Sequence, residues 1–296
     1  MQGQIRKALA GFYYVYTNGK TYQTRARGNF RKRKLTPLVG DFVEFEAEND
    51  TDGYILELLP RHNMLIRPNI ANIDQGIIIM SVVEPNFSTN LLDRFLVTLE
   101  KEDISAVIYL SKLDLVTDEQ RKEFEQVKVD YEKIGYKVIL SSDHSLEEII
   151  NCFPKHLSVF MGQSGAGKST LLNKISPELQ LATAQISQSL GRGKHTTRHV
   201  ELHPINQGLV ADTPGFSSID FLNIEAVDLP KMFPEFVRLS VHCKFRECQH
   251  LHEPSCAVKE ALETQEILQS RYDNYLQFLD EIKNTKPVYQ KKKKGS

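Results

Sequence analysis

Residues 157–174 read LSVFMGQSGAGKSTLLNK: an apolar run, a glycine-rich turn and a helix-compatible continuation. The turn matches GxxxxGK[ST], and its flanks predict a strand before it and a helix after it. Glycines let consecutive backbone N–H groups surround phosphate oxygens, and the helix N-terminus adds partial positive charge. The pattern predicts a P-loop, with Lys168 on the β and γ phosphates and Ser169 on Mg²⁺. The expected nucleotide-binding residues are Gly162, Gln163, Ser164, Gly165, Ala166, Gly167, Lys168, Ser169 and Thr170.

A second phosphate-linked motif, DTPG, occupies residues 212–215 and follows the apolar residues 208–211. An aspartate at the carboxyl end of a strand beside a P-loop is placed to hold Mg²⁺, usually through water. We therefore expect Asp212 to contribute to a magnesium site and the Gly215 N–H to contact a γ-phosphate.

A candidate switch lies between these motifs, where residues 191–198 read GRGKHTTR. Thr196 and Thr197 could complete the Mg²⁺ shell, in a segment that is ordered only when a γ-phosphate is present. A solvated basic loop would explain the same residues equally well.

A third motif points to guanine. A guanine-specific site needs a carboxylate to accept the N1–H and N2–H₂ donors of the base, and GTPases supply it as Asn-Lys-x-Asp after a strand. The candidate follows the strand-like residues 104–110 and consists of Ser111, Lys112, Leu113 and Asp114. The next strand ends at Ser141 and Ser142, which could brace the base through backbone groups. The alternative is a surface turn with no role.

These motifs run in the order base motif, P-loop, switch, Asp-x-x-Gly, a cyclic rotation of the usual GTPase order. Alternating strands and helices between residues 70 and 225 predict a mainly parallel α/β sheet covered on both faces. Strands are expected at 74–83, 104–110, 136–141, 157–161, 199–203 and 207–211, and helices at 89–102, 117–134, 145–151 and 168–175.

Residues 1–66 predict short β-strands instead. Residues 11–17 and 20–24 flank Asn18-Gly19, a strong hairpin signal, and further strands are expected at 39–45 and 53–58. An N-terminal OB-fold barrel fits this pattern best, and a small SH3-like barrel is the alternative.

The barrel region carries a concentration of positive charge although the whole chain has a formal net charge of −1. Barrel loops with Arg, Lys and Phe30 suit nucleic-acid backbones and unstacked bases, although a solvated loop remains the alternative. The candidate RNA-binding residues are Arg25, Arg27, Arg31, Lys32, Arg33 and Lys34.

The C-terminal part combines a Cys/His cluster with a long amphipathic helical stripe over residues 261–282. Three thiolates and one imidazole make a closed tetrahedral Zn²⁺ set, which is typical of a structural metal. The expected ligands are Cys243, Cys248, His250 and Cys256, with His242 and His252 as competing ligands and metal-free cysteines as the alternative. Cys152 stands apart and is expected in a core.

Composition sets the broad class. The chain has 296 residues, of which 41% are apolar and 25% charged, so a fibrous or wholly disordered protein is excluded. No run approaches the roughly 20 apolar residues of a membrane span, and no apolar segment follows the basic N-terminus. With only four cysteines, a reducing, cytoplasmic compartment is the default.

Together the motifs resemble the circularly permuted GTPases that act in maturation of the small ribosomal subunit. The resemblance covers about residues 4–282 and rests on RGNFRK (27–32), SKLD (111–114), GQSGAGKS (162–169), GRGKHTT (191–197), DTPG (212–215) and the cluster 243–256. It implies an OB-fold domain (1–66), a permuted GTPase domain (67–225) and a zinc-binding α-helical domain (226–296), bound near the decoding region of the small subunit and its 16S rRNA. Ser111 departs from the usual Asn, but the base-reading Asp114 is present.

Ras-like enzymes carry a water-orienting Gln after Asp-x-x-Gly, but Phe216 occupies that place here. His195 is the best local substitute, and a backbone or RNA contact is its alternative role. We therefore expect a slow, monomeric, Mg²⁺-dependent GTPase and late assembly factor, stimulated by the small subunit, with Lys168, His195, Thr196 and Thr197 as catalytic residues. A P-loop ATPase or small-molecule kinase, and an RNA-binding zinc protein with a purely structural nucleotide, are the rival interpretations.

Overall fold

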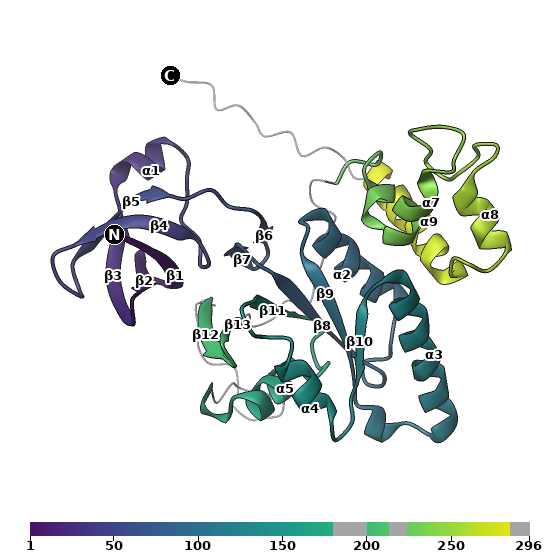
Figure 1. The fold of residues 1–296 in the computed structure, drawn as a ribbon, viewed down its shortest axis with the longest axis horizontal. Helices are drawn as coiled ribbons and strands as arrows, with labels where there is room; N and C mark the ends of the chain where they lie inside the picture. The colour runs from purple at the N-terminus through teal and green to yellow at the C-terminus, as the bar shows by residue number, and fades with distance from the viewer. Residues whose placement is uncertain (180–199, 213–223, 285–296) are drawn as a thin grey trace. The chain divides into compact units, whose positions relative to one another are not determined.

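The structure is a computed structural model that describes residues 1–179, 200–212 and 224–284 (Figure 1). These residues fall into two compact units. The first contains residues 1–87, 102–179 and 200–212, and the second contains residues 88–101 and 224–284. No helix in the described part of the chain combines the length and the apolar character that a bilayer crossing needs.

The N-terminal strands form a closed five-stranded barrel. They are β1 (Gln2–Leu9), β2 (Phe12–Thr17), β3 (Lys20–Ala26), β4 (Phe42–Ala47) and β5 (Gly53–Leu58). They pair in the order β1-β2-β3-β5-β4, β4 returns to β1, and β3 and β5 are parallel. This is the OB-type arrangement, so the prediction of an OB-fold rather than an SH3-like barrel is confirmed. Ile5, Val15 and Phe45 are fully buried in its core.

The turn between β2 and β3 shows why the sequence forms this hairpin. Asn18 and Gly19 have φ values of 48° and 81°, the left-handed conformation that both residues tolerate and that a two-residue hairpin turn requires. After β3 comes a short helix, α1 (Gly28–Lys32), where the sequence predicts only a loop. A two-stranded ribbon, β6 (Met64–Ile66) and β7 (Asn69–Ala71), leads on from the barrel.

The second sheet region contains the predicted nucleotide motifs. Its strands are β8 (Gln75–Ser81), β9 (Ser105–Ser111), β10 (Lys137–Leu140), β11 (Leu157–Met161), β12 (Glu201–Ile205) and β13 (Gly208–Asp212). The order is β10-β9-β8-β11-β13-β12, with only β12 antiparallel, as the mainly parallel prediction requires. β12 also pairs with β1 at Lys7 and Glu201, whose side chains form an ion pair at 2.7 Å.

Helices α3 (Asp118–Ile134), α4 (Ser145–Ile150) and α5 (Lys168–Ile175) accompany this sheet. α3 begins with a capping box in which Thr117 and Gln120 satisfy each other's backbone N–H groups. Two 3₁₀ turns, η1 (Leu113–Leu115) and η2 (Pro177–Leu179), follow β9 and α5. Cys152, 8% exposed, lies in the apolar cluster shared by these strands and helices, as expected.

The second unit is helical. It contains α2 (Thr89–Lys101), η3 (Leu229–Met232), α7 (Pro234–Ser240), α8 (Ala257–Glu263) and α9 (Gln269–Asn284). α2 lies between β8 and β9 in the chain, yet it packs with α9 and η3 (Figure 1). The domain boundaries expected from the sequence stay a prediction.

Candidate nucleotide site and metal centre

The glycine-rich turn after β11 has a backbone that only glycine fits. Gly162 has a φ of 137°, and a Cβ there would lie 2.1 Å from the carbonyl oxygen of Ile79 on the neighbouring strand. Gly165 and Gly167 also have positive φ values, 82° and 99°. The backbone therefore has the tight turn that the P-loop motif predicts, and Gly167 leads directly into α5.

Lys168 opens α5, and its ammonium folds back over the loop. Its Nζ donates to the carbonyl oxygens of Gly162 at 2.5 Å and Gln163 at 2.8 Å. Burial lowers the pKa of Lys168 to about 8, because the charged ammonium loses hydration there. A phosphate at this place would supply a compensating anion. Ser169 is half-buried beside it, and Ser164 and Thr170 are exposed.

The base motif meets the P-loop directly. Ser111, the last residue of β9, donates its hydroxyl to the carbonyl oxygen of Ala166 at 2.7 Å. Lys112 then takes a left-handed conformation with φ 64°, and the Leu113 N–H donates to Ser141 Oγ at 3.0 Å. Segments 55 positions apart in the chain are joined by the Ser111–Ala166 hydrogen bond. The serine that replaces the usual asparagine thus ties the two motifs together.

Asp114 is exposed in η1 at the end of this loop, with its carboxylate open to a ligand. Ser142 is exposed as well, and its carbonyl oxygen accepts from the Ser145 hydroxyl at 2.8 Å. Ser141 braces the motif loop through its side chain, not only through the backbone as expected from the sequence.

One part of this site was not anticipated from the sequence. The Lys112 ammonium donates to the carbonyl oxygens of Glu84 at 2.5 Å and Val83 at 3.4 Å, just beyond β8. Pro85 lies against the P-loop, because a Cβ on Gly165 would come within 3.6 Å of its Cδ. The only sequence signal for residues 83–85 is that they lie at the end of a predicted strand, because ligands of open α/β sheets bind where neighbouring strands end.

The magnesium and switch residues are described only in part. Asp212 ends β13, which runs parallel to β11 in the register Val159↔Ala211, so both strands reach the same edge of the sheet. The Asp212 side chain, Gly215 and the switch residues lie outside the described part of the chain. The switch residues in question are His195, Thr196 and Thr197.

The Cys/His cluster converges as predicted. The ligand atoms of Cys243, Cys248, His250 and Cys256 all lie within 4.8 Å of one another. His250 Nδ1 is 3.8 Å from Cys243 Sγ and 3.3 Å from Cys256 Sγ. Tetrahedral bonds of about 2.3 Å to sulfur and 2.0 Å to nitrogen would separate such atoms by about 3.6 Å, so the set fits zinc. The competing candidates, His242 and His252, are exposed and outside this set.

Neighbouring groups hold the loop that carries His250. Tyr272 on α9 donates its hydroxyl to the His250 carbonyl at 2.6 Å, and the Glu253 carboxylate accepts from the N–H groups of Gln249 and Leu251, both at 2.8 Å. Burial raises the pKa of Cys248 to about 12, and the neighbouring Cys256 and Cys243 thiols also favour its neutral form. A cation would reverse that balance, because metal binding displaces thiol protons.

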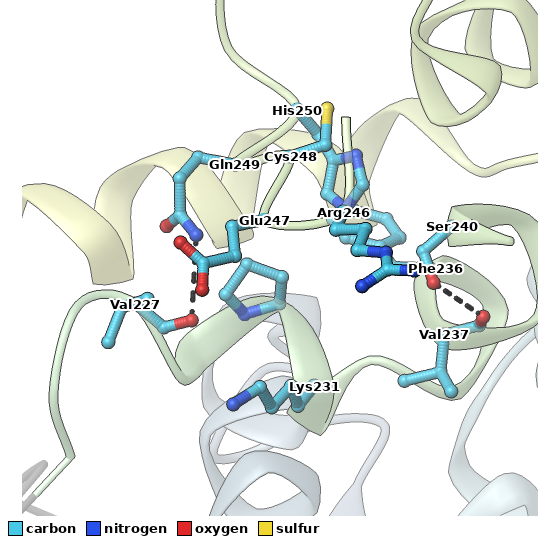
Figure 2. Close-up of a pocket in the computed structure, with 11 residues that line it drawn as sticks. Val227, Lys231, Phe236, Val237, Ser240, Arg246, Glu247, Cys248, Gln249 and His250 are labelled. Carbon is cyan, nitrogen blue, oxygen red and sulfur yellow. Dashed lines mark hydrogen bonds between the residues drawn. The ribbon is translucent and has the colours of Figure 1, made fainter. Parts of the chain in front are cut away.

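Cys248 and His250 also form part of the wall of a pocket of about 200 Å³ (Figure 2). Phe236, Lys231 and Arg246 contribute to that wall, and Figure 2 shows the two cationic side chains approaching it from different segments.

Comparison with known proteins identifies the family of this chain. The RsgA GTPase family model matches residues 58–222, and the RsgA N-terminal domain model matches residues 2–55. The chain belongs to the RsgA GTPase family.

RsgA relatives match almost end to end. A small ribosomal subunit biogenesis GTPase RsgA of Enterococcus faecalis is 67% identical over 293 residues, covering 99% of each chain. One of Lactococcus lactis is 58% identical, covering 99% of this chain and 98% of its own. A crystal structure of YloQ, a circularly permuted GTPase, has 49% identity and a TM-score of 0.83 over 97% of this chain and 96% of its own. YjeQ from Thermotoga maritima has 32% identity and the same TM-score over 96% and 99%.

The RsgA membership confirms two predictions: the circularly permuted GTPase fold behind an OB-like barrel, and the enzyme class, a GTPase. The individual site residues stay predictions, now with the geometry given above.

The basic segment of the barrel differs in one respect from the sequence prediction. Phe30 is 2% exposed, so the expectation that it presents a ring to unstacked bases is wrong; α1 turns it into the interior instead. Arg25 lies over the Phe12 ring at 4.6 Å and Arg27 pairs with Glu46. Lys32, Arg33 and Lys34 are exposed.

Proposed function

We propose that this RsgA-family GTPase acts in late maturation of the small ribosomal subunit, in the cytoplasm, with hydrolysis stimulated by that subunit. The observation that carries the proposal is the Ser111–Ala166 hydrogen bond, which joins the proposed guanine-reading motif to the glycine-rich loop. The relatives named for small-subunit biogenesis support the biological part, since they match over nearly the full chain.

The proposed chemistry is hydrolysis without a covalent intermediate. Water attacks the γ-phosphate while Lys168 neutralises charge on the phosphate oxygens, and Asp114 holds the base. His195 is proposed to approach the attacking water. Mg²⁺, when bound, adds charge compensation on the phosphates; Ser169, Asp212 and either Thr196 or Thr197 would hold it.

The proposed partner is 16S rRNA, contacted by the barrel's basic segment, with the protein acting as a monomer. Lys32, Arg33 and Lys34 are exposed and suit phosphate contacts on a rigid barrel. Arg31 belongs to the same proposed surface. Arg25 and Arg27 have partners within the barrel, so their contribution would be smaller.

The test is GTP and ATP turnover with and without purified small subunits. We expect slow GTP hydrolysis alone, faster hydrolysis with subunits, and no comparable ATP hydrolysis. Reversing Lys32, Arg33 and Lys34 to Glu should weaken subunit binding and lower its salt slope by about one unit or less per lost contact. Intrinsic turnover should stay unchanged.

The matched control places the same charge change on α3, as Lys122→Glu, Lys128→Glu and Lys133→Glu. Stimulation that survives the barrel substitutions, or falls equally in both variants, would contradict an RNA contact through the barrel segment. GTP turnover that subunits do not change would contradict the proposed partner.

We also propose that the Cys/His cluster holds one structural zinc ion. Elemental analysis of protein purified without chelators should find one zinc per chain in the wild type and in the control variant Cys152→Ser. Cys248→Ser should lower zinc affinity at least about 100-fold, since a hydroxyl is not deprotonated as a thiolate is, and should destabilise the second unit. Protein that contains no zinc, or full zinc retention in Cys248→Ser, would contradict this assignment.

A further inference from the structure

Three charged side chains lie in the interior of the second unit, far from any role in the proposed chemistry. Arg271 on α9 and Asp93 on α2 are both 0% exposed, and Glu235 on α7 is 2% exposed. Arg271 donates to both oxygens of Glu235, at 2.7 and 3.0 Å, and to Asp93 Oδ1 at 2.8 Å. Buried charges are costly to desolvate, and separating such a pair leaves an uncompensated charge in the interior. The three side chains therefore favour the arrangement of α2, α7 and α9 in which they stay paired.

The group continues into a polar contact along one face of α2. Asn274 on α9 donates to Asp93 Oδ2 at 2.6 Å and accepts from Asn90 at 3.0 Å. One turn further, Arg94 pairs with Glu281 on α9. Positions 90, 93 and 94 lie on a single helix face, and α9 satisfies all three. α2 is therefore fixed to α9 by directional bonds, not only by apolar packing.

The chain leads directly from α2 to the base motif. Ser88 immediately precedes α2, and its hydroxyl accepts from the Leu91 N–H in the first turn of that helix at 3.2 Å. Only a few residues before it, the carbonyls of Val83 and Glu84 hold the Lys112 ammonium, and Pro85 lies against the P-loop. The segment between β8 and α2 thus touches both nucleotide motifs at one end and enters the α9-bound helix at the other.

We infer that Asp93, Arg271 and Glu235 form a buried lock that positions Lys112 for the guanine nucleotide, so that nucleotide binding and the contact between α2 and α9 are thermodynamically coupled. The inference rests on the proposed guanine site. Asp93 and Arg271 are positioning residues: they act through residues 82–88 and touch no nucleotide. Because such coupling is reciprocal, bound nucleotide must stabilise the α2–α9 contact as much as that contact favours the nucleotide.

The first experiment is a double-mutant cycle on GDP affinity, measured with a fluorescent GDP analogue. Asp93→Asn keeps the side-chain volume but removes the negative charge. It also places an amide opposite the Asn274 amide, which in the wild type donates to a carboxylate oxygen. We expect it to weaken GDP binding about fivefold. In a Lys112→Ala background the same substitution should have no further effect, because the ammonium that it positions is gone.

The matched control is Val258→Ala, a cavity in the apolar cluster of the same unit, on a helix that contributes none of these hydrogen bonds. It should lower the unit's stability yet leave GDP affinity unchanged. Equal weakening by Val258→Ala, or additive effects of Asp93→Asn and Lys112→Ala, would overturn the coupling. If Lys112→Ala itself left GDP affinity unchanged, the proposed guanine site would fall instead.

A second measurement avoids reliance on variant stability. Hydrogen exchange of the amides in α2 and α9 should slow when GDP saturates the wild-type protein, and should respond less in Asp93→Asn. Exchange in α9 that ignores GDP in the wild type would overturn the inference.

Discussion

We expect Lys168→Ala to lower the rate of GTP hydrolysis by about 100- to 1,000-fold in a single-turnover assay. The lysine is placed to neutralise charge that develops on the γ-phosphate, and the structure shows its ammonium already inside the P-loop, on the carbonyls of Gly162 and Gln163. The matched control is Lys174→Ala, an exposed lysine on the same helix, which should keep wild-type turnover. Equal rates in the two variants would contradict a catalytic role for Lys168.

The same lysine should give nucleotide affinity a pH signature. Its pKa of about 8 in the nucleotide-free protein should rise when phosphate oxygens surround the ammonium. The lysine's contribution to binding is then complete below about pH 8 and is lost as the pH rises above it. Lys168→Arg supplies a cation that does not titrate, so it should lack this loss. The measurement is nucleotide affinity of the wild type and of Lys168→Arg, determined by fluorescence titration between pH 7 and 9. If the two affinities changed with pH in parallel, the titration of Lys168 would not contribute to binding.

The nucleotide motifs were predictable because their chemistry constrains the backbone. The P-loop needs glycine at position 162, where a Cβ would meet the Ile79 carbonyl oxygen, and this requirement appears in the sequence as the GxxxxGK[ST] pattern. The contact between Ser111 and Ala166 was not predictable from either motif alone. It depends on β8 lying between β9 and β11, which only the sheet order reveals.

Elements with polar sequences account for most of what the sequence did not predict. β1 was not anticipated as a strand because only Ile5 is fully buried among its eight residues, so no alternation is visible. α2 was anticipated as a helix, but its contacts with α9 through positions 90, 93 and 94 were not. Charged residues are rarely buried, and no pattern within α2 announces partners on α9. Phe30 shows the converse, a ring among basic residues that is nevertheless buried.

Asp114→Asn should exchange guanine for xanthine specificity. A carboxylate accepts the N1–H and N2–H₂ donors of guanine together, and charge-assisted hydrogen bonds are the stronger kind. An amide loses the charge and turns one acceptor into a donor, which meets the guanine amino group unfavourably. Two such bonds at about 1.5–3 kcal/mol each imply at least about 100-fold weaker GDP binding.

Xanthine carries an oxygen where guanine carries the amino group, so the amide that Asp114→Asn introduces can donate to it while the wild-type carboxylate repels it. Xanthosine diphosphate should therefore bind the variant better than it binds the wild type. The wild type should prefer GDP, and the variant should prefer xanthosine diphosphate. Asp114 is exposed at the end of η1 and its loop is held by Ser111 and Ser141, so the substitution should leave the fold intact. Asp118→Asn, another exposed acid at the start of α3, is the matched control and should bind GDP like the wild type. A variant that kept GDP affinity and ignored xanthosine diphosphate would show that SKLD does not read the base, and the guanine contact would then have to come from a different loop at this edge of the sheet.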